Sequence, residues 1–148
     1  SKSRSLDGAR LGFGAACEEL ISDLNTIRNS TNPYNINAVT MAAGIGVLDD
    51  EEYTQKNCQA VIENRQYTIE QLEAMGFTLT DSTANFIFMK HPDVDGGAIY
   101  EEMKKRGVLV RHFTKDRIAQ YNRVTIGSRE QMDTFLNVLR EVVKEELK

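Results

Sequence analysis

Apolar residues recur at helical spacing in the first third of the chain. Leu20, Leu24 and Ile27 fall on one face of a helix predicted over residues 17–28. The stretch NSTNPYNIN ends this helix, because a proline pushes the residue before it away from helical geometry. The Ala- and Gly-rich segment that follows predicts a second, closely packed helix over residues 37–48.

Two other patterns flank these helices. Upstream, Leu11 and Phe13 alternate with small residues, which predicts a short buried strand or strand-like passage. Downstream, a long amphipathic helix is predicted to about Met75, with Asp49 and Asp50 as candidate caps and with Gly76 ending it in a left-handed conformation. Its predicted apolar stripe contains Val61, Ile62, Ile69 and Leu72.

The pattern then changes to strands, predicted over residues 77–80 and 84–90. The run FIFM in the second of these is almost entirely apolar, which predicts burial on both faces. We expect the two strands to pair as neighbours, as in a hairpin.

The last third alternates helix and strand. A helix is predicted over residues 95–106, strands over 108–110 and 123–126, and a final helix behind a capping box formed by Ser128 and Gln131. Its apolar residues at helical spacing are Met132, Phe135, Leu136, Leu139 and Val143. The pattern predicts an α/β fold with helices packed on a small sheet.

Composition narrows the class of protein. The chain has 148 residues, 41% of them hydrophobic and 27% charged, with a net charge of −4. This balance is that of a globular protein of about one domain, and it favours neither nucleic-acid nor membrane binding. No apolar run is long enough to cross a bilayer and no secretory signal is recognised, so a cytoplasmic location is expected.

Thiols and imidazoles are too few and too scattered to predict a metal site. Cys17 and Cys58 are far apart and neither belongs to a CxxC pair, so neither a disulfide framework nor zinc is indicated. His91 and His112 complete the set of soft ligands. We therefore expect no metal.

Basic residues near the start of the chain admit two interpretations. Lys2 can be a solvated lysine, or a covalent amine if its pKa is lowered or a carbonyl partner is held near it. Arg10 can bind phosphate in a two-pronged fashion, and the small residues Gly8 and Gly12 leave room for an anion beside the backbone.

Two arginines stand at the ends of predicted strands. Arg111 ends VLVR and Arg123 opens RVTIG. Arginines at strand ends beside a glycine can face a cleft that binds carboxylate or phosphate, although a purely structural role fits equally well. His112 is expected to be a packed neighbour rather than a base, because no nucleophile lies near it in the sequence.

Several segments, in order, resemble one family. SKSRSLDGARLGF is similar to the SKxxxLAGxRxGF segment around the cofactor lysine of fold-type-I pyridoxal-phosphate aminotransferases, in particular the histidinol-phosphate aminotransferases. NPYNINAVTMAA, STANFIFMKHP, GVLVRHF and NRVTIGSREQMDTFL follow in the order of that family. The resemblance covers essentially the whole chain.

The resemblance implies roles for the first segment. Lys2 matches the lysine that binds pyridoxal 5'-phosphate covalently and then moves the substrate proton. Ser1 and Arg10 match residues that hold the cofactor phosphate. Asp7 departs from the family pattern, which has a small residue there, and adds an anion beside a phosphate site.

The resemblance also implies substrate-binding residues. Arg123 matches the arginine that binds the substrate carboxylate or the corresponding end of histidinol phosphate. Arg111 and Tyr34 match positions near the substrate, with phosphate recognition as the expected role. The implied partners are an amino donor and a 2-oxo acid, and the implied parent enzyme is a homodimer that works in histidine biosynthesis.

The family also implies a division of the chain. Residues 1–48 correspond to a helical remnant of the large, cofactor-binding domain, with the lysine loop and two helices, and residues 49–148 to the small C-terminal α/β domain. We expect a C-terminal part of the enzyme that is inactive alone, because the family's other cofactor-binding groups have no counterpart here.

Three alternatives stay open at this point. An aminotransferase of the same family could act on aromatic or other amino acids. A non-catalytic α/β module could bind a phosphorylated metabolite through Arg111 and Arg123. The chain could also serve only as an interaction piece that associates with itself through exposed apolar surface.

Overall fold

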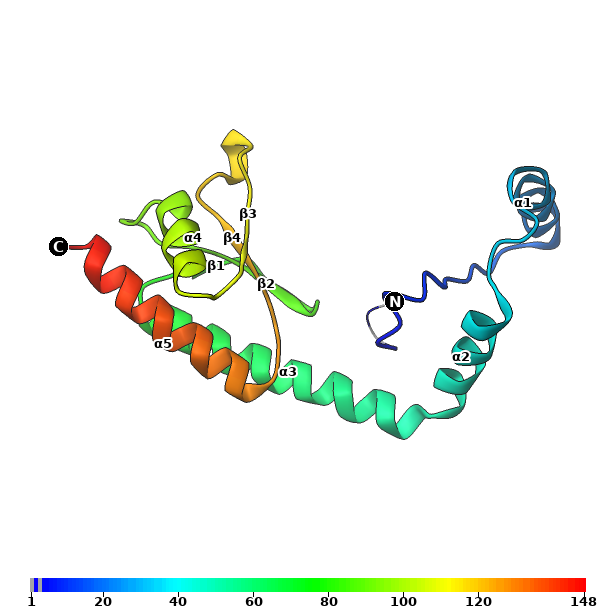
Figure 1. The fold of residues 1–148 in the computed structure, drawn as a ribbon, viewed down its shortest axis with the longest axis horizontal. Helices are drawn as coiled ribbons and strands as arrows, with labels where there is room; N and C mark the ends of the chain where they lie inside the picture. Colours follow the sequence, from blue (N-terminus) through cyan, green and yellow to red (C-terminus); the bar gives the residue numbers. More distant parts are fainter. Residues whose placement is uncertain (1, 3) are drawn as a thin grey trace. The chain divides into compact units, whose positions relative to one another are not determined.

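The structure, a computed structural model, describes residue 2 and residues 4–148. It divides into two compact units, Ser1–Cys58 and Gln59–Lys148, and the helix α3 (Glu51–Ala74) has residues in both (Figure 1). The predicted domain boundary after residue 48 stays a prediction. In the described part of the chain, no helix is long and apolar enough to cross a membrane.

The first unit contains the two predicted helices, α1 (Glu18–Thr31) and α2 (Ala38–Asp49), followed by the start of α3. Asn37 caps α2, because its side-chain oxygen accepts the Thr40 N–H at 2.9 Å. Asp50 caps α3 as predicted, accepting the Tyr53 N–H at 3.1 Å. Both helix predictions are therefore confirmed, with ends that shift by one to three residues.

The apolar face of α1 is open. Leu20, Leu24 and Ile27 are 55%, 57% and 60% exposed, and the helix has no buried residue. The amphipathic pattern is present as predicted, but no described part of this unit covers it.

The strand predicted around Leu11 and Phe13 is wrong. Residues 11–17 have no regular secondary structure, and Phe13 is 96% exposed. A strand needs a neighbour for its backbone hydrogen bonds, and no described strand pairs with this segment. Leu11 packs on α2 instead, where a Cβ at Gly44 would collide with its side chain.

The second unit is built on a four-stranded antiparallel sheet with strand order β1-β2-β4-β3. The strands are β1 (Thr78–Leu79), β2 (Phe86–Lys90), β3 (Arg111–His112) and β4 (Asn122–Thr125). The remaining elements are the C-terminal part of α3, α4 (Gly96–Lys105), the short 3-10 helix η1 (Asp116–Ile118) and α5 (Arg129–Glu146). The predicted α/β class, with β1 and β2 paired as neighbours, is confirmed.

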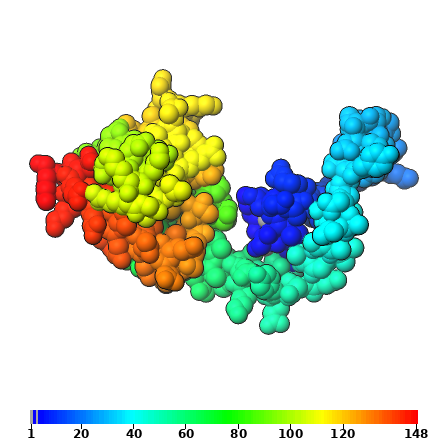
Figure 2. All heavy atoms as spheres, in the orientation of Figure 1, coloured from blue at the N-terminus to red at the C-terminus, as the bar shows by residue number. Residues whose placement is uncertain are grey.

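Helices cover one face of this sheet. Ile87, Met89 and Val124 are buried on that face. The space-filling view shows α4 (yellow-green) directly against α5 (orange to red) (Figure 2). The same core contains Leu72, Phe77, Val94, Ile99, Met103, Ile126, Val142 and the five predicted apolar residues of α5.

The predicted burial of β2 on both faces is wrong. Phe86 is 37% exposed and Phe88 is half-buried, whereas Ile87 and Met89 are buried. This alternation is what an antiparallel sheet shows when helices cover only one side. The apolar run of β2 therefore places two phenylalanines on the uncovered face.

Local signals end the elements as expected. Gly76 and Gly107 follow α3 and α4 with φ of 86° and 80°, a conformation that favours glycine. Ser128 and Gln131 form the predicted capping box of α5. The strand predicted over 108–110 is displaced to Arg111–His112, because Val108 and Val110 pack against the core instead.

Side chains join the second unit's helices to one another and to the sheet. The Tyr67 hydroxyl donates to Asp133 Oδ1 at 2.7 Å, and Arg140 donates to Gln71 Oε1 at 2.8 Å, so α3 and α5 run side by side (Figure 1). Arg65 donates to the Ala84 carbonyl at 2.7 Å, before β2. These contacts hold α3 beside the sheet.

The cap of α4 provides a test of this unit's stability. Asp95 Oδ2 accepts the Ala98 N–H at 2.9 Å, and Gln120 donates to Asp95 Oδ1 at 3.1 Å. Replacing Asp95 by Ala is expected to lower the free energy of unfolding by about 1 kcal/mol in urea denaturation of the chain at neutral pH. Asp95→Asn keeps an acceptor oxygen and should lose less than half as much; an equal loss would contradict the cap.

The same cap has a pH signature. Hydrogen bonds from the Ala98 N–H and from Gln120 lower the pKa of Asp95 below its ordinary 3.8. A carboxylate with a lowered pKa stabilises the fold fully above its unfolded pKa, and that contribution is lost as the pH falls through the folded pKa. The difference between the chain and Asp95→Ala should therefore shrink below pH 3.8.

Candidate functional site

The side chain of Lys2 lies in an exposed turn of the first unit. The Ser5 N–H donates to the Lys2 carbonyl at 3.2 Å, which closes a turn that contains Lys2, Arg4 and Ser5. The Lys2 Nζ forms an ion pair with Asp7 Oδ2 at 2.9 Å, and both side chains are more than half exposed. Lys2 is therefore accessible, with its ammonium opposite a carboxylate.

Asp7 links Lys2 to Arg10. The hydrogen bond and charge of Lys2, and then the charge of Arg10, lower the pKa of Asp7 below its ordinary value. Arg10 is exposed and has a φ of 54°. The space where side chains at Gly8 and Gly12 would stand is open, so the loop has room for an anion beside Arg10.

Arg4 is the residue of this segment that sequence reasoning missed. Its Nη1 lies 2.7 Å from Glu51 Oε2, 3.0 Å from Thr54 Oγ1 and 3.1 Å from the Val47 carbonyl oxygen. These partners follow Arg4 by 43–50 residues, and no local pattern in the sequence pairs them.

Tyr34 and Ser1 are the other two predicted residues of the first unit. Tyr34 is 91% exposed in the segment between α1 and α2. Ser1 lies outside the residues that the structure describes. Both assignments stay predictions.

The structure pairs Arg111 with Arg123 in the second unit. They are direct partners in the antiparallel register of β3 and β4, and Phe88 of β2 is the partner of Arg123 on its other side. Paired residues of antiparallel strands share a face, with Cβ atoms about 5 Å apart. The row lies on the face opposite Ile87 and Met89, and we call this uncovered face, with Arg111 and Arg123, the arginine face.

Aromatic rings support both guanidinium groups. The Arg111 Cζ lies 5.2 Å from the centre of the Phe113 ring, and the Arg123 Cζ lies 5.2 Å from that of Phe86. Phe113 also packs edge-on against Phe88 at 5.6 Å. Cation–π contacts of this kind orient a guanidinium group without occupying its donors.

The arginine face has two electrostatically unfavourable features, and a bound anion would relieve the repulsion between its arginines. Like charges opposite one another in a sheet are unfavourable, and among the described residues neither Arg111 nor Arg123 forms an ion pair with a carboxylate. The buried Nε of Arg123 also has no hydrogen-bond partner there. A carboxylate or phosphate group bound by the accessible ends of the two guanidinium groups would neutralise the pair.

Other candidates have weaker support. His112 stacks on Tyr100 at 5.7 Å, and its buried Nδ1 has no partner among the described residues. Its packing agrees with the predicted role as a neighbour. Over the described part of the chain, no three His, Cys, Asp or Glu side chains gather as metal ligands would.

An exposed lysine turn and a pair of arginines are typical of proteins that bind anionic substrates. The comparison with known families identifies the family. The model for "Aminotransferase class I and II" matches residues 1–139. The chain belongs to this family.

Relatives and solved structures agree with this aminotransferase family. A histidinol-phosphate aminotransferase of Clostridium botulinum strain Okra is 44% identical over 143 residues, which is 97% of this chain and 40% of the relative. A Chromohalobacter salexigens enzyme of the same name is 39% identical over 97% of this chain and 41% of the relative. The chain thus spans about 40% of the length of the curated relatives it matches.

The fold also matches solved aminotransferases. The histidinol-phosphate aminotransferase of Sinorhizobium meliloti, solved in complex with pyridoxal-5'-phosphate, superimposes with a TM-score of 0.86 at 23% identity over 98% of this chain and 39% of that chain. This likeness shows that the chain has the fold of that part of an aminotransferase.

The ion pair between Lys2 and Asp7 gives a prediction for this aminotransferase chain. Asp7→Asn removes the carboxylate that contacts the Lys2 Nζ. Acylation of Lys2 by an amine-specific reagent at neutral pH should then speed up roughly two- to fivefold, the scale of an exposed pair, because the nitrogen is no longer held against Asp7. Quantitative mass spectrometry of the Lys2 peptide measures the rate. Asp23→Asn is the control, and an unchanged rate in Asp7→Asn would contradict the pair.

The arginine face gives a second prediction. Inorganic phosphate at several times its Kd, added at constant ionic strength, should raise the Tm of the chain by about 2–4 °C. Arg111→Leu should remove most of this rise, whereas Arg117→Leu on η1 should keep it. Equal rises in all three proteins would show that phosphate acts elsewhere.

Proposed function

We propose that this chain is the C-terminal part of a pyridoxal 5'-phosphate-dependent aminotransferase that exchanges an amino group between histidinol phosphate and 2-oxoglutarate. The observation that carries the proposal is the register pairing of Arg111 with Arg123 on an uncovered sheet face. A phosphorylated or carboxylated substrate supplies the anion that this pair lacks. Family membership and the names of the relatives support the same reaction.

The residues of the first unit fit the cofactor. A primary amine is needed to bond an aldehyde, and Lys2 is an exposed amine. A guanidinium group is needed for the phosphate, and Arg10 is exposed beside open space in the same loop. When bound, pyridoxal 5'-phosphate supplies the electron sink of transamination.

Different residues of this chain would bind the cofactor and the substrate. Lys2 would bond the cofactor and move the proton at the substrate α-carbon, while Arg10 and Ser1 would hold the cofactor phosphate. Arg123 would bind the substrate's carboxylate or the corresponding end of histidinol phosphate, and Arg111 and Tyr34 its phosphate. Proton transfer by Lys2 uses the same amine that contacts Asp7 in this structure.

The parent is proposed to be longer than this chain. The relatives are about two and a half times as long as the matched part, from the 40% share, and the open apolar face of α1 is a surface that further chain could cover. We propose that the 148-residue chain is inactive alone. Homodimeric assembly, a cytoplasmic location and a place in histidine biosynthesis belong to the same proposal, with support from the family alone.

A variant of the arginine face in the full-length enzyme tests which substrate the enzyme uses. Arg111→Leu should lower kcat/KM for histidinol phosphate roughly 10- to 100-fold, because a hydrogen bond to a charged group is lost. The loss for phenylalanine, which has no phosphate, should be less than about threefold. Steady-state assays with 2-oxoglutarate as acceptor measure both.

Other outcomes identify the alternatives. Equal losses for both substrates would contradict phosphate recognition by Arg111 and favour an aromatic or other amino-acid aminotransferase. Binding of histidinol phosphate without transamination of any amino acid would favour a non-catalytic module. Arg117→Leu serves as the matched control.

A further inference from the structure

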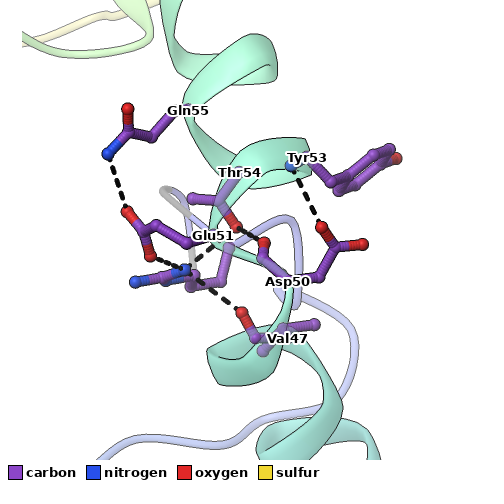
Figure 3. Close-up of polar contacts among 7 residues, drawn as sticks. Val47, Asp50, Glu51, Tyr53, Thr54 and Gln55 are labelled. Carbon is purple, nitrogen blue, oxygen red and sulfur yellow. Dashed lines mark hydrogen bonds and ion pairs between the residues drawn. The ribbon is translucent and has the colours of Figure 1, made fainter.

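The contacts of Arg4 tie the lysine turn to the place where α2 ends and α3 begins. The Arg4 Nη1 contacts the Glu51 carboxylate, the Thr54 hydroxyl and the Val47 carbonyl. Figure 3 labels these three partners and draws dashed lines to them. Nη1 carries two protons, so these three acceptors share them. Both protons of Nη1 are thus engaged with these acceptors.

The junction that Arg4 contacts is itself well fixed. The Asp50 side chain accepts the Tyr53 N–H at 3.1 Å, and the Thr54 hydroxyl donates to the Asp50 carbonyl at 3.1 Å. Val47 lies in the last turn of α2, where free carbonyl groups attract cations. Glu51 is the first residue of α3. Arg4 therefore binds an ordered point, not a mobile loop.

The contact of Arg4 is less exposed to solvent than an ordinary surface ion pair. The Arg4 side chain is 27% exposed and Thr54 is 8% exposed, while the carboxylate partner Glu51 is 55% exposed, so it is the arginine end of the contact that is partly buried. Hydrogen bonds from Arg4 and then from Gln55 lower the pKa of Glu51, so the carboxylate is ionised at neutral pH and the ion pair is present there. By contrast, Lys2 and Asp7 are 63% and 60% exposed.

Arg4 lies inside the turn that starts at Lys2. The Ser5 N–H donates to the Lys2 carbonyl at 3.2 Å, so the Arg4 backbone is part of the same closed turn as Lys2. Fixing the Arg4 side chain on the junction therefore limits where the Lys2 backbone can move. The Lys2 side chain keeps its freedom, held only by an exposed ion pair.

We propose that Arg4 is a positioning residue for Lys2, which fastens the turn of Lys2 to the α2–α3 junction so that the amine is presented to the cofactor. The inference rests on the proposed function, because it needs Lys2 to bond the cofactor. The Nη1 of Arg4 is already shared by three acceptors, whereas Arg10 forms no ion pair with a carboxylate among the described residues, which favours Arg10 as the phosphate ligand of this segment. The two arginines of the segment thus have separate tasks.

The test compares cofactor affinity with and without the Lys2 amine. In the full-length protein, titration with pyridoxal 5'-phosphate gives the Kd of four forms: the unchanged protein, Arg4→Met, Lys2→Ala and the double variant. A misplaced amine loses the advantage of pre-oriented reaction. Arg4→Met is therefore expected to weaken binding roughly tenfold when Lys2 is present and less than about twofold in the Lys2→Ala background.

Matched variants make the test specific. Arg28→Met, the same change on α1, should leave the Kd unchanged. Glu51→Gln removes the charge from the other side of the contact and should weaken binding severalfold, again only when Lys2 is present. Arg4→Lys keeps one charge and should recover part of the loss. If circular dichroism shows that Arg4→Met does not fold, the Kd with and without the Lys2 amine is compared in Glu51→Gln and Arg4→Lys instead.

The outcomes separate the inference from the proposed function. Equal weakening in both Lys2 backgrounds, or no weakening in either, would overturn the positioning role while the cofactor function stands. If Lys2→Ala binds the cofactor as tightly as the unchanged protein, Lys2 does not bond it, and both proposals fail together.

Discussion

One-sided burial of the small antiparallel sheet is the constraint on which the second unit depends. Because α4 and α5 share a core with Ile87, Met89 and Val124, the intervening residues of β2 and β4 must face away from them. Arg123 and Phe88 occupy those positions in one register row, and β3 adds Arg111 to its end. A shift of one residue in register would move the arginine into the core and Val124 into water. The same strand register therefore determines both the packing of the core and the position of the candidate anion site.

The first unit is organised differently. Its helix α1 buries no residue. The unit is therefore ordered by the caps of α2 and α3 and by a few long-range polar contacts rather than by a hydrophobic core. Chief among these contacts is Arg4, which joins a turn near the start of the chain to the junction of α2 and α3. This gives the Lys2 turn a fixed support although the lysine side chain itself is open to solvent, a useful combination for an amine that must reach a carbonyl group.

Local sequence signals predicted much of this fold because their causes are local. The capping box at Ser128, the glycine after α3 and the apolar spacing of α5 each act within a few residues, and all three are confirmed. Burial of β2 on both faces and a strand at Leu11 were wrong, since run length and alternation do not say which neighbours exist. Strand ends suggested Arg111 and Arg123, but their cross-strand pairing and the contacts of Arg4 depend on residues distant in sequence. Neither could be read from a local pattern.

The central claim is that the turn at Lys2 and the arginine face belong to one aminotransferase. It is tested most directly by incubating the full-length protein with pyridoxal 5'-phosphate, reducing it with borohydride and mapping the modified peptides by mass spectrometry. We expect one predominant adduct, on Lys2, that is lost when histidinol phosphate has first converted the cofactor to its amine form. An adduct spread over other lysines, or one on Lys2 that this substrate leaves unchanged, would contradict it.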